Sequence, residues 1–155
     1  MKIIKLILLF AFSFLVVFSL SFAQQGKRTA VILDTKGKVE TKAPKEGWVS
    51  AKVGDVLSEG YVIRTVGSDS FALIKLEGKE TSDVEIKKNS QLRLAELAED
   101  KQKSTQSTML DLALGDILIK AEKLQSDKSK FEVKTPTSIV GVRGTTFSVS
   151  VEAVQ

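Results

Sequence analysis

The sequence contains no cysteine and no histidine among its 155 residues. A chain without cysteine forms no disulfide bonds, so its folded state depends on side-chain packing. The two absences also exclude thiol nucleophiles, Ser-His and Cys-His triads and ordinary zinc sites. Composition leaves oxygen-ligand metal sites and Ser-Lys chemistry open, but no spacing in the chain suggests them. We therefore expect no metal, no cofactor and no enzymatic turnover.

Clustered charge of one sign is also missing. The chain has 23 Lys and Arg against 19 Asp and Glu, a formal net charge of +4. Bases and acids are interleaved, as at Lys75 and Glu77 or at Glu85 and Lys87. A nucleic-acid interface needs basic residues gathered on one face, so this pattern argues against a nucleic-acid partner.

The acidic residues do not form a recognisable metal loop either. Glu80, Asp83 and Glu85 lie close together after Gly78. A calcium loop needs alternating ligands, a central glycine and a closing glutamate, and this spacing is absent. We interpret these three residues as surface acids.

The first 23 residues have the pattern of a secretory signal peptide. Lys2 and Lys5 form a positive n-region, an apolar run follows, and Ser21-Phe22-Ala23 puts small residues where signal peptidase reads them. Cleavage after Ala23 predicts a periplasmic or secreted protein with no stable membrane insertion. The alternative is an inner-membrane anchor at residues 3–22, close to the ~20 residues that a bilayer requires. A lipoprotein is excluded because no cysteine exists to carry the lipid.

Cleavage leaves 132 residues (155 minus 23) with a net charge of +2, because Lys2 and Lys5 are removed. This length suits one domain with a single core. After a polar lead at residues 24–28, apolar and polar residues alternate in short runs separated by turn residues. The predicted strands lie at residues 29–34, 38–42, 48–52, 61–66, 71–77, 84–88, 91–97, 109–114, 117–122, 131–135, 139–142 and 146–151.

This spacing predicts an all-β domain over residues 29–155. The expected form is a twisted β-sandwich or a β-solenoid-like roll of about ten to twelve short strands. The polar segment 98–107 interrupts the alternation. We interpret it as a solvated loop, with a frayed helical turn as the alternative.

Two Gly-Asp pairs give a weak internal echo. Gly54-Asp55 and Gly115-Asp116 are each followed by two apolar residues, with an offset of 61 residues (115 minus 54). The echo is explained either by two similar strand–turn–strand units or by ordinary turn chemistry, since Asp hydrogen-bonds its own backbone.

The single Trp also has two interpretations. Trp48 follows Gly47 and precedes Val49. It either plugs one end of the sandwich or stacks on a ligand ring such as a sugar. Burial is the simpler expectation because tryptophan has a large apolar area.

The most informative segment is at residues 131–151. Two alternating runs enclose Thr135-Pro136 and a stretch with two glycines, Gly141-Val142-Arg143-Gly144-Thr145, before Phe147. Glycines before a core strand supply positive φ or a close backbone approach. Arg143 is either a solvated side chain or an anchor for a partner carboxylate. The last predicted strand, 146–151, is a candidate for an uncovered sheet edge.

Four pieces in order together resemble the FecR domain family of the bacterial envelope. They are Lys36-Gly37-Lys38-Val39 with Trp48, residues 53–74 with Gly54-Asp55 and Gly67-Ser68, residues 110–117 with Gly115-Asp116, and residues 131–149 with Thr135-Pro136 and Val142-Arg143-Gly144-Thr145. The resemblance implies an all-β extracytoplasmic domain. In the best-known members this domain follows an anti-sigma segment and receives a signal from an outer-membrane transporter. Only five residues precede the apolar run here, so we expect a stand-alone exported domain and do not carry over the anti-sigma role.

The resemblance also implies a cleavage site. Some anti-sigma members are cut at the Gly-Thr bond of this motif by an N→O acyl shift. In this chain the Thr145 hydroxyl would attack the Gly144 carbonyl carbon and release the Thr145 amine, forming an ester that water then opens. The step needs strain and an oxyanion donor. Self-cleavage would be a single-turnover event.

These expectations combine into one functional hypothesis. We expect a non-enzymatic extracytoplasmic module that recognises an unidentified protein in envelope signalling or assembly. The expected mechanism is pairing of a partner strand onto an exposed sheet edge. The alternative is a carbohydrate- or peptidoglycan-binding module, marked by clustered exposed aromatics. The sequence does not identify the stimulus. It leaves the oligomeric state open between a monomer and a weakly self-associating protein.

Overall fold

The computed structural model describes residues 25–152, which form strands and connecting segments without a helix. The predicted signal peptide and anchor, residues 1–23, lie outside the described residues, as does Gln24. The strands of the described part are β1 (Gln25–Lys27), β2 (Ala30–Lys42), β3 (Trp48–Ser50), β4 (Val56–Leu57), β5 (Val62–Leu76), β6 (Ser82–Ile86), β7 (Gln91–Asp100), β8 (Thr105–Ala121), β9 (Lys130–Lys134), β10 (Ile139–Val142) and β11 (Thr146–Val151). The predicted all-β fold class is confirmed. The described segment therefore offers no helix suited to crossing a membrane.

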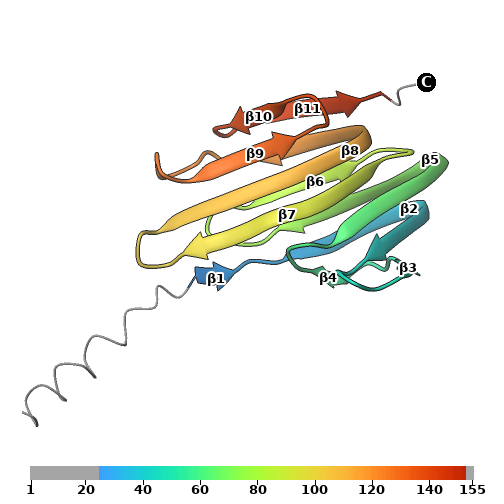
Figure 1. Ribbon diagram of the computed structural model, residues 1–155, viewed down its shortest axis with the longest axis horizontal. Helices are drawn as coiled ribbons and strands as arrows, with labels where there is room; N and C mark the ends of the chain where they lie inside the picture. The colour runs from blue at the N-terminus through green and yellow to red at the C-terminus, as the bar shows by residue number, and fades with distance from the viewer. Residues whose placement is uncertain (1–24, 153–155) are drawn as a thin grey trace, which may run out of the picture.

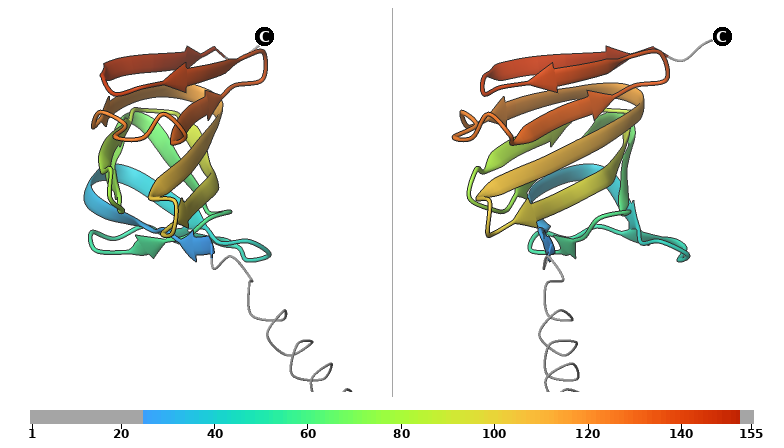
Figure 2. Two further views of the ribbon diagram at one scale, coloured as in Figure 1. Left: turned by 90° about the vertical axis from the view of Figure 1, so that its left-hand side faces the viewer. Right: turned by 60° about the vertical axis from the view of Figure 1, so that its left-hand side comes forward.

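All eleven strands belong to one twisted sheet that folds over into two layers (Figures 1 and 2). The first layer runs β3, second half of β2, first half of β5, β7, first half of β8, β9, β10. The second layer runs β4, first half of β2, second half of β5, β6, second half of β8, β11. Because β5 and β8 serve both layers, β5, β6, β8 and β7 close into a ring. This is the predicted twisted sandwich.

The long strands pass between layers at glycines. β2, β5 and β8 were each predicted as two strands, and each is one continuous strand that contains Gly37, Gly67 or Gly115. Gly115 has φ +88°, and the hydroxyl of Ser90 accepts a hydrogen bond from the Asp116 N–H at 2.9 Å beside it. Bends of this kind let a strand switch sheets without ending. A bend and a turn use the same residue types, which is why the sequence alone suggested separate strands.

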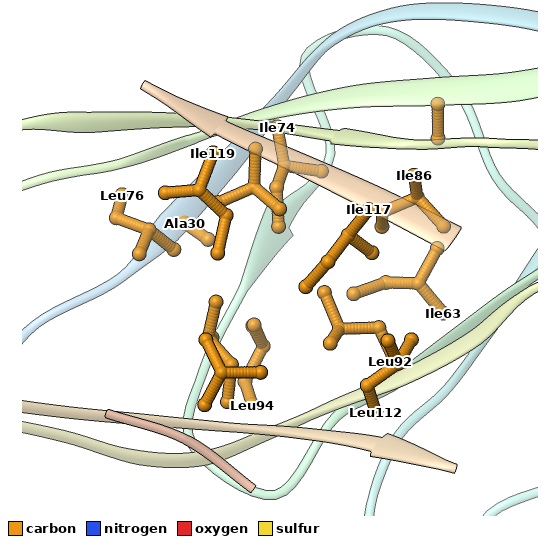
Figure 3. Packing of buried hydrophobic residues seen from close by; sticks show 14 of the residues in the cluster. Ala30, Ile63, Ile74, Leu76, Ile86, Leu92, Leu94, Leu112, Ile117 and Ile119 are labelled. Atoms are coloured by element: carbon orange, nitrogen blue, oxygen red, sulfur yellow. The ribbon is translucent and has the colours of Figure 1, made fainter. Parts of the chain in front are cut away.

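The core lies between the two layers. Alternate residues of the long strands point inward, and most of their side chains are branched aliphatics with little or no exposed area. In Figure 3 the side chains from β5, β6 and the end of β8 face those from β7 and the start of β8. The fully buried members include Ile63, Ile74, Leu76, Ile86, Leu92, Leu94, Leu112, Ile117 and Ile119. A disulfide-free chain is thus held together by packing of the kind that its composition required.

The polar segment 98–107 is mostly strand, and the solvated loop that was expected is limited to an exposed turn at residues 101–104, while the frayed helical turn is wrong. β7 continues to Asp100 and β8 begins at Thr105, and the two strands form a tight hairpin. The Asp100 carboxylate accepts the backbone N–H groups of Gln102 and Lys103 at 3.0 Å each. The alternation was missed because the inward-facing side chains of this hairpin are polar.

The polar lead contains more structure than a lead suggests. β1 pairs antiparallel with the end of β7, with Gly26 opposite Glu99. Arg28 follows, and its side chain is buried. The β-structure therefore begins ahead of Thr29, where the domain was expected to start.

Candidate functional site

The terminal motif, residues 131–151, lies at one end of the sandwich, where both layers end (Figure 2). Thr135 and Pro136 form the turn between β9 and β10. The Thr135 N–H donates to the Ser138 carbonyl at 2.8 Å, and the Thr135 hydroxyl accepts the Ser138 N–H at 3.0 Å. Thr135 is buried and orders this turn. The motif thus positions two strands, β10 and β11, that end the two layers.

β10 is the edge strand of the first layer. Among residues 25–152 it pairs only with β9, with Val140 opposite Val133 and Gly141 opposite Glu132. Hydrogen-bonded pairs alternate along an antiparallel ladder, and the bond between Thr135 and Ser138 fixes the phase. The N–H and C=O groups of Val140 and Val142 therefore point to β9. Those of Ile139 and Gly141 point to the free edge.

β11 is the edge strand of the second layer. In the part of the chain that the structure describes, it pairs only with the second half of β8, with Val149 opposite Ile117. The Ala121 N–H donates to the Thr145 carbonyl at 3.1 Å, which fixes the phase of this ladder. By the same alternation, the backbone groups of Thr146, Ser148 and Ser150 point away from β8. The last predicted strand is thus an edge, as expected.

The two layers have different numbers of strands beyond β8. Beyond β8 the first layer has two further strands, β9 and β10, while the second layer has only β11. The inner face of β10 is therefore not fully covered, and the inward-facing Val140 remains 39% exposed. A groove of about 550 Å³ lies here between the two edges. Its lining includes Leu114, Pro136, Val140, Ser148, Val149 and Val151.

Gly144 and Thr145 form the turn that connects the two layers. Gly144 has φ +93°, and a Cβ there would lie 2.9 Å from the Lys123 backbone nitrogen. Thr145 is exposed. The adjacent Arg143 guanidinium pairs with the exposed Asp127 at 3.2 Å. Positive φ and close backbone packing account for this glycine without cleavage chemistry.

The other motif residues divide between core and surface. Val142 is buried and packs in the core cluster, while Phe147 is half-buried against its margin. Gly141 is exposed, and a Cβ there would meet nothing within 4 Å. The expectation that Gly141 provides positive φ or a close approach is not met at this position.

The two Gly-Asp pairs lie in different settings. Gly54-Asp55 is part of a turn before β4, and Gly115-Asp116 is a bend inside β8. Both aspartate carbonyls accept a neighbouring strand N–H, from Ile32 at 3.0 Å and from Lys87 at 2.9 Å. The following residues differ in burial, since Val56 is exposed and its counterpart Ile117 is buried. Only the pair at 115–116 adjoins β11.

Trp48 does not plug the core. It lies on β3, half-buried, with the Arg64 guanidinium carbon 3.9 Å from its ring centroid. Arg64 is held by Glu40 through a 2.8 Å ion pair. Lys42 also approaches the ring, at 5.9 Å. One face of the indole is thus covered by a cation of the same chain, and Tyr61 packs against the core.

A buried polar cluster was missed by the sequence interpretation. Glu80 was expected at the surface and is only 5% exposed, so that expectation was wrong. Its Oε1 accepts the Gln125 N–H at 2.6 Å, while its Oε2 has no hydrogen-bond partner among the described residues. Nearby, Arg28 donates to the Thr108 hydroxyl at 2.7 Å. Desolvation by burial lowers the pKa of Arg28, and the charges of Glu99 and Glu80 raise it.

The alternation of inward and outward positions along the strands would have revealed this cluster. Glu80 lies on the same alternate positions as the buried Val84 and Ile86, and Gln106 and Thr108 precede the buried Leu110 in the same way. Polar residues at inward positions were counted as surface because they are polar. The cluster ties the start of the domain to the segment that leads into β9.

A comparison with protein families places the terminal motif in a wider context. The family model described as FecR protein matches residues 61–155, more than half of the chain. The matched range contains the closed ring and both edge strands, and it excludes β1 to β4. No curated protein and no solved structure matched the chain.

Proposed function

The chain belongs to the FecR family, and on this basis we propose that it is a non-enzymatic extracytoplasmic module that recognises another protein in envelope signalling or assembly. Family membership implies a signalling-related module associated with the cell envelope. The proposal adds the mode of recognition. An extended segment of the partner protein pairs with the free edge of β11 and lies over the inner face of β10.

The unequal ending of the two layers is the observation that carries the proposal. The second layer is one strand short of the first, and the groove of about 550 Å³ occupies the missing position. Thr146, Ser148 and Ser150 offer outward backbone groups along one side of it. A strand added to a sheet edge gains main-chain hydrogen bonds, and its alternate side chains enter adjoining pockets.

The chemistry of the groove defines the partner segment. Its floor is apolar at Leu114, Val140 and Val149, and its rim is formed by hydroxyl-bearing residues such as Thr137 and Ser150. A partner strand that alternates apolar and small polar residues fits this surface. Apolar side chains would then cover Val140, which is the least covered inward residue of β10.

Crosslinking at defined positions tests this mode of recognition. A photoreactive residue at position 148 or 150, in cells that produce the protein, should capture one protein, with crosslinks two residues apart in an extended segment. Ser148→Pro removes an outward N–H and should abolish capture from position 150, while Ser148→Ala should preserve it. Capture that is unchanged by the proline variant would contradict edge pairing. Position 58, at the opposite end, is the control.

The carbohydrate alternative depends on exposed aromatic residues. Trp48 has Arg64 over one face of its ring, which leaves less surface for a sugar to stack on. Cosedimentation with isolated sacculi distinguishes glycan binding from protein recognition. A glycan-binding module would sediment with the sacculi, and its Trp48→Ala variant would not. We expect no sedimentation of either protein.

Cleavage between Gly144 and Thr145 stays a prediction of the family resemblance. The proposal of a non-enzymatic module expects this bond to remain intact. Intact-mass spectrometry of the wild type beside Thr145→Ala measures it directly. A fragment that begins at Thr145 in the wild type alone would show self-cleavage and would revise the proposal.

A further inference from the structure

We propose that the β3–β4 segment, residues 48–57, lies against the phospholipid surface of the membrane that the apolar run at residues 3–22 enters. The sequence left open whether this run is removed or retained, and the proposed contact requires that it is retained. The segment lies at the end of the sandwich remote from β10 and β11 (Figures 1 and 2). The contact is therefore independent of the strand pairing proposed above.

β1 leaves almost no slack between the apolar run and the domain. Only Ala23 and Gln24 separate the run from β1, and two residues span at most about 7 Å. β1 pairs with residues 98–100 of β7, and the Arg28 N–H that follows it donates to the Leu97 carbonyl at 3.0 Å. A run held in the bilayer therefore brings this end of the domain to the membrane surface.

The β3–β4 segment lies beside β1. Leu57 of β4 is opposite Ala30, at the start of β2. The Glu59 carboxylate, two residues further on, accepts the Leu97 N–H at 3.1 Å, and the Leu97 carbonyl is the one that receives the chain after β1. A membrane close to β1 is thus close to this segment as well.

The segment forms the outer edge of the sandwich here, and it carries three exposed valines. Within residues 25–152, β3 and β4 each pair only with β2, and the turn between them donates the Gly54 N–H to the Ile32 carbonyl at 2.8 Å. Val49, Val53 and Val56 are 58%, 60% and 57% exposed. Apolar side chains gathered on one surface mark a contact with protein or lipid, and the adjacent apolar run selects lipid.

Charge and backbone define how the segment meets the bilayer. In residues 42–59 three lysines balance three acids, so the contact depends on apolar area and not on anionic lipid. The outer N–H and C=O groups of β3 and β4 would have no partner in hydrocarbon. The valines therefore reach the boundary between headgroups and acyl chains, and the exposed Lys45 and Lys52 place their ammonium groups among the headgroups.

Quenching of Trp48, the only tryptophan, tests the contact, because Trp48 begins β3. The full chain with residues 1–23 is reconstituted in phosphatidylcholine vesicles that carry bromine at a chosen depth of the acyl chains. Bromine near the headgroups should reduce the emission of Trp48 more than bromine at the chain ends. Trp48→Phe with Ile139→Trp moves the reporter to the opposite end, where neither lipid should quench it, and equal quenching there would contradict the contact.

A flexible insertion separates docking from simple tethering. Ten glycine and serine residues placed between Ala23 and Gln24 let the domain move about 15–20 Å from the membrane. Docking should keep Trp48 quenched in this insertion variant, whereas a domain that is only tethered would regain its emission.

Serine substitutions in the insertion variant identify the side chains that make the contact. Val53→Ser should reduce the quenching, and adding Val49→Ser and Val56→Ser should abolish it. Ile139→Ser changes a residue that is also 60% exposed, at the opposite end, and should leave the quenching unchanged. Circular dichroism of each variant establishes that it is folded.

Three results would overturn the proposal. One is protein extracted from cells with an intact mass that lacks residues 1–23. The second is Trp48 emission that the insertion alone restores, and the third is quenching that the valine substitutions leave unchanged. None of the three affects capture of a partner from positions 148 and 150, which tests the proposed function separately.

Discussion

Trp48 shows how one residue on the outer face can be ordered by charge. Arg64 stacks on the indole and is fixed in turn by Glu40. Cation–π pairs at exposed sites contribute about 0.5–1 kcal/mol. The hydrogen bond from Arg64 is the main reason that the pKa of Glu40 lies below its ordinary value. The ring is therefore positioned by a carboxylate that it does not touch.

Acid should release this arrangement, and the emission of the only tryptophan reports it. The pKa of Glu40 is lowered in the folded protein. The ionised carboxylate therefore stabilises the Arg64–Trp48 arrangement fully at pH values above the ordinary glutamate pKa, and this stabilisation is lost as the pH falls through the folded pKa. Trp48 emission should therefore change in acid before the protein unfolds. Glu40→Gln should show the acid emission already at neutral pH. Asp111→Asn, which breaks the pair with Arg93 instead, should keep the wild-type titration.

At the scale of single elements, the decisive feature is whether a glycine ends a strand or bends it. The sequence predicted most strand positions, because period-2 alternation survives wherever one face is buried. It did not predict that β5 and β8 run through Gly67 and Gly115. A strand continues only if distant segments supply hydrogen bonds on both sides of the bend, and local composition does not contain that information. The outward edge groups of β10 and β11 depend on the same long-range ladders.

The Gly115 bend should be far less tolerant of substitution than Gly141. Alanine at 115 would carry φ +88° and bring its Cβ to 2.6 Å from Ser90 Cα. Left-handed strain and overpacking together should lower the free energy of unfolding by about 2–4 kcal/mol. Gly141→Ala meets nothing and should change it by less than about 0.5 kcal/mol. Urea unfolding of both variants measures the contrast, and equal midpoints would refute it.

Proline scanning along β11 checks which backbone groups are outward. Val149→Pro removes an N–H that points to β8 and should cost about 2 kcal/mol or more. Ser148→Pro removes an outward N–H, and proline is accepted on the open side of an edge strand. Its melting temperature should stay close to that of the wild type. If Ser148→Pro were the more destabilising of the two variants, the hydrogen-bonding phase assigned to β11 would be wrong by one residue.

At the scale of the whole molecule, two regions bear on function, an open end of the sandwich and a buried polar cluster. One end is open, with β10 and β11 as its edge strands (Figure 1). The groove of about 550 Å³ lies between these two edges. Elsewhere Glu80, Arg28 and Gln106 form a buried polar cluster that fastens the segment leading to β9. The FecR match covers the open end and Glu80 and Gln106 of the cluster, while Arg28 lies outside the matched residues. A packed body that presents an open edge is the arrangement that the proposed mode of recognition requires.

The Glu80 contact should govern how firmly the terminal motif is attached to the body. Glu80→Ala removes the acceptor of the Gln125 N–H and a nearby counter-charge of the buried Arg28. Leaving buried donors unpaired should lower the free energy of unfolding by about 1–3 kcal/mol. Glu77→Ala, three residues earlier, is the matched control because it changes an exposed side chain. Arg28 donates to the backbone oxygen of Glu77, which this substitution leaves in place. Hydrogen exchange should also quicken at residues 122–130 in the Glu80 variant, and protection equal to that of the control would show that the cluster does not hold this segment.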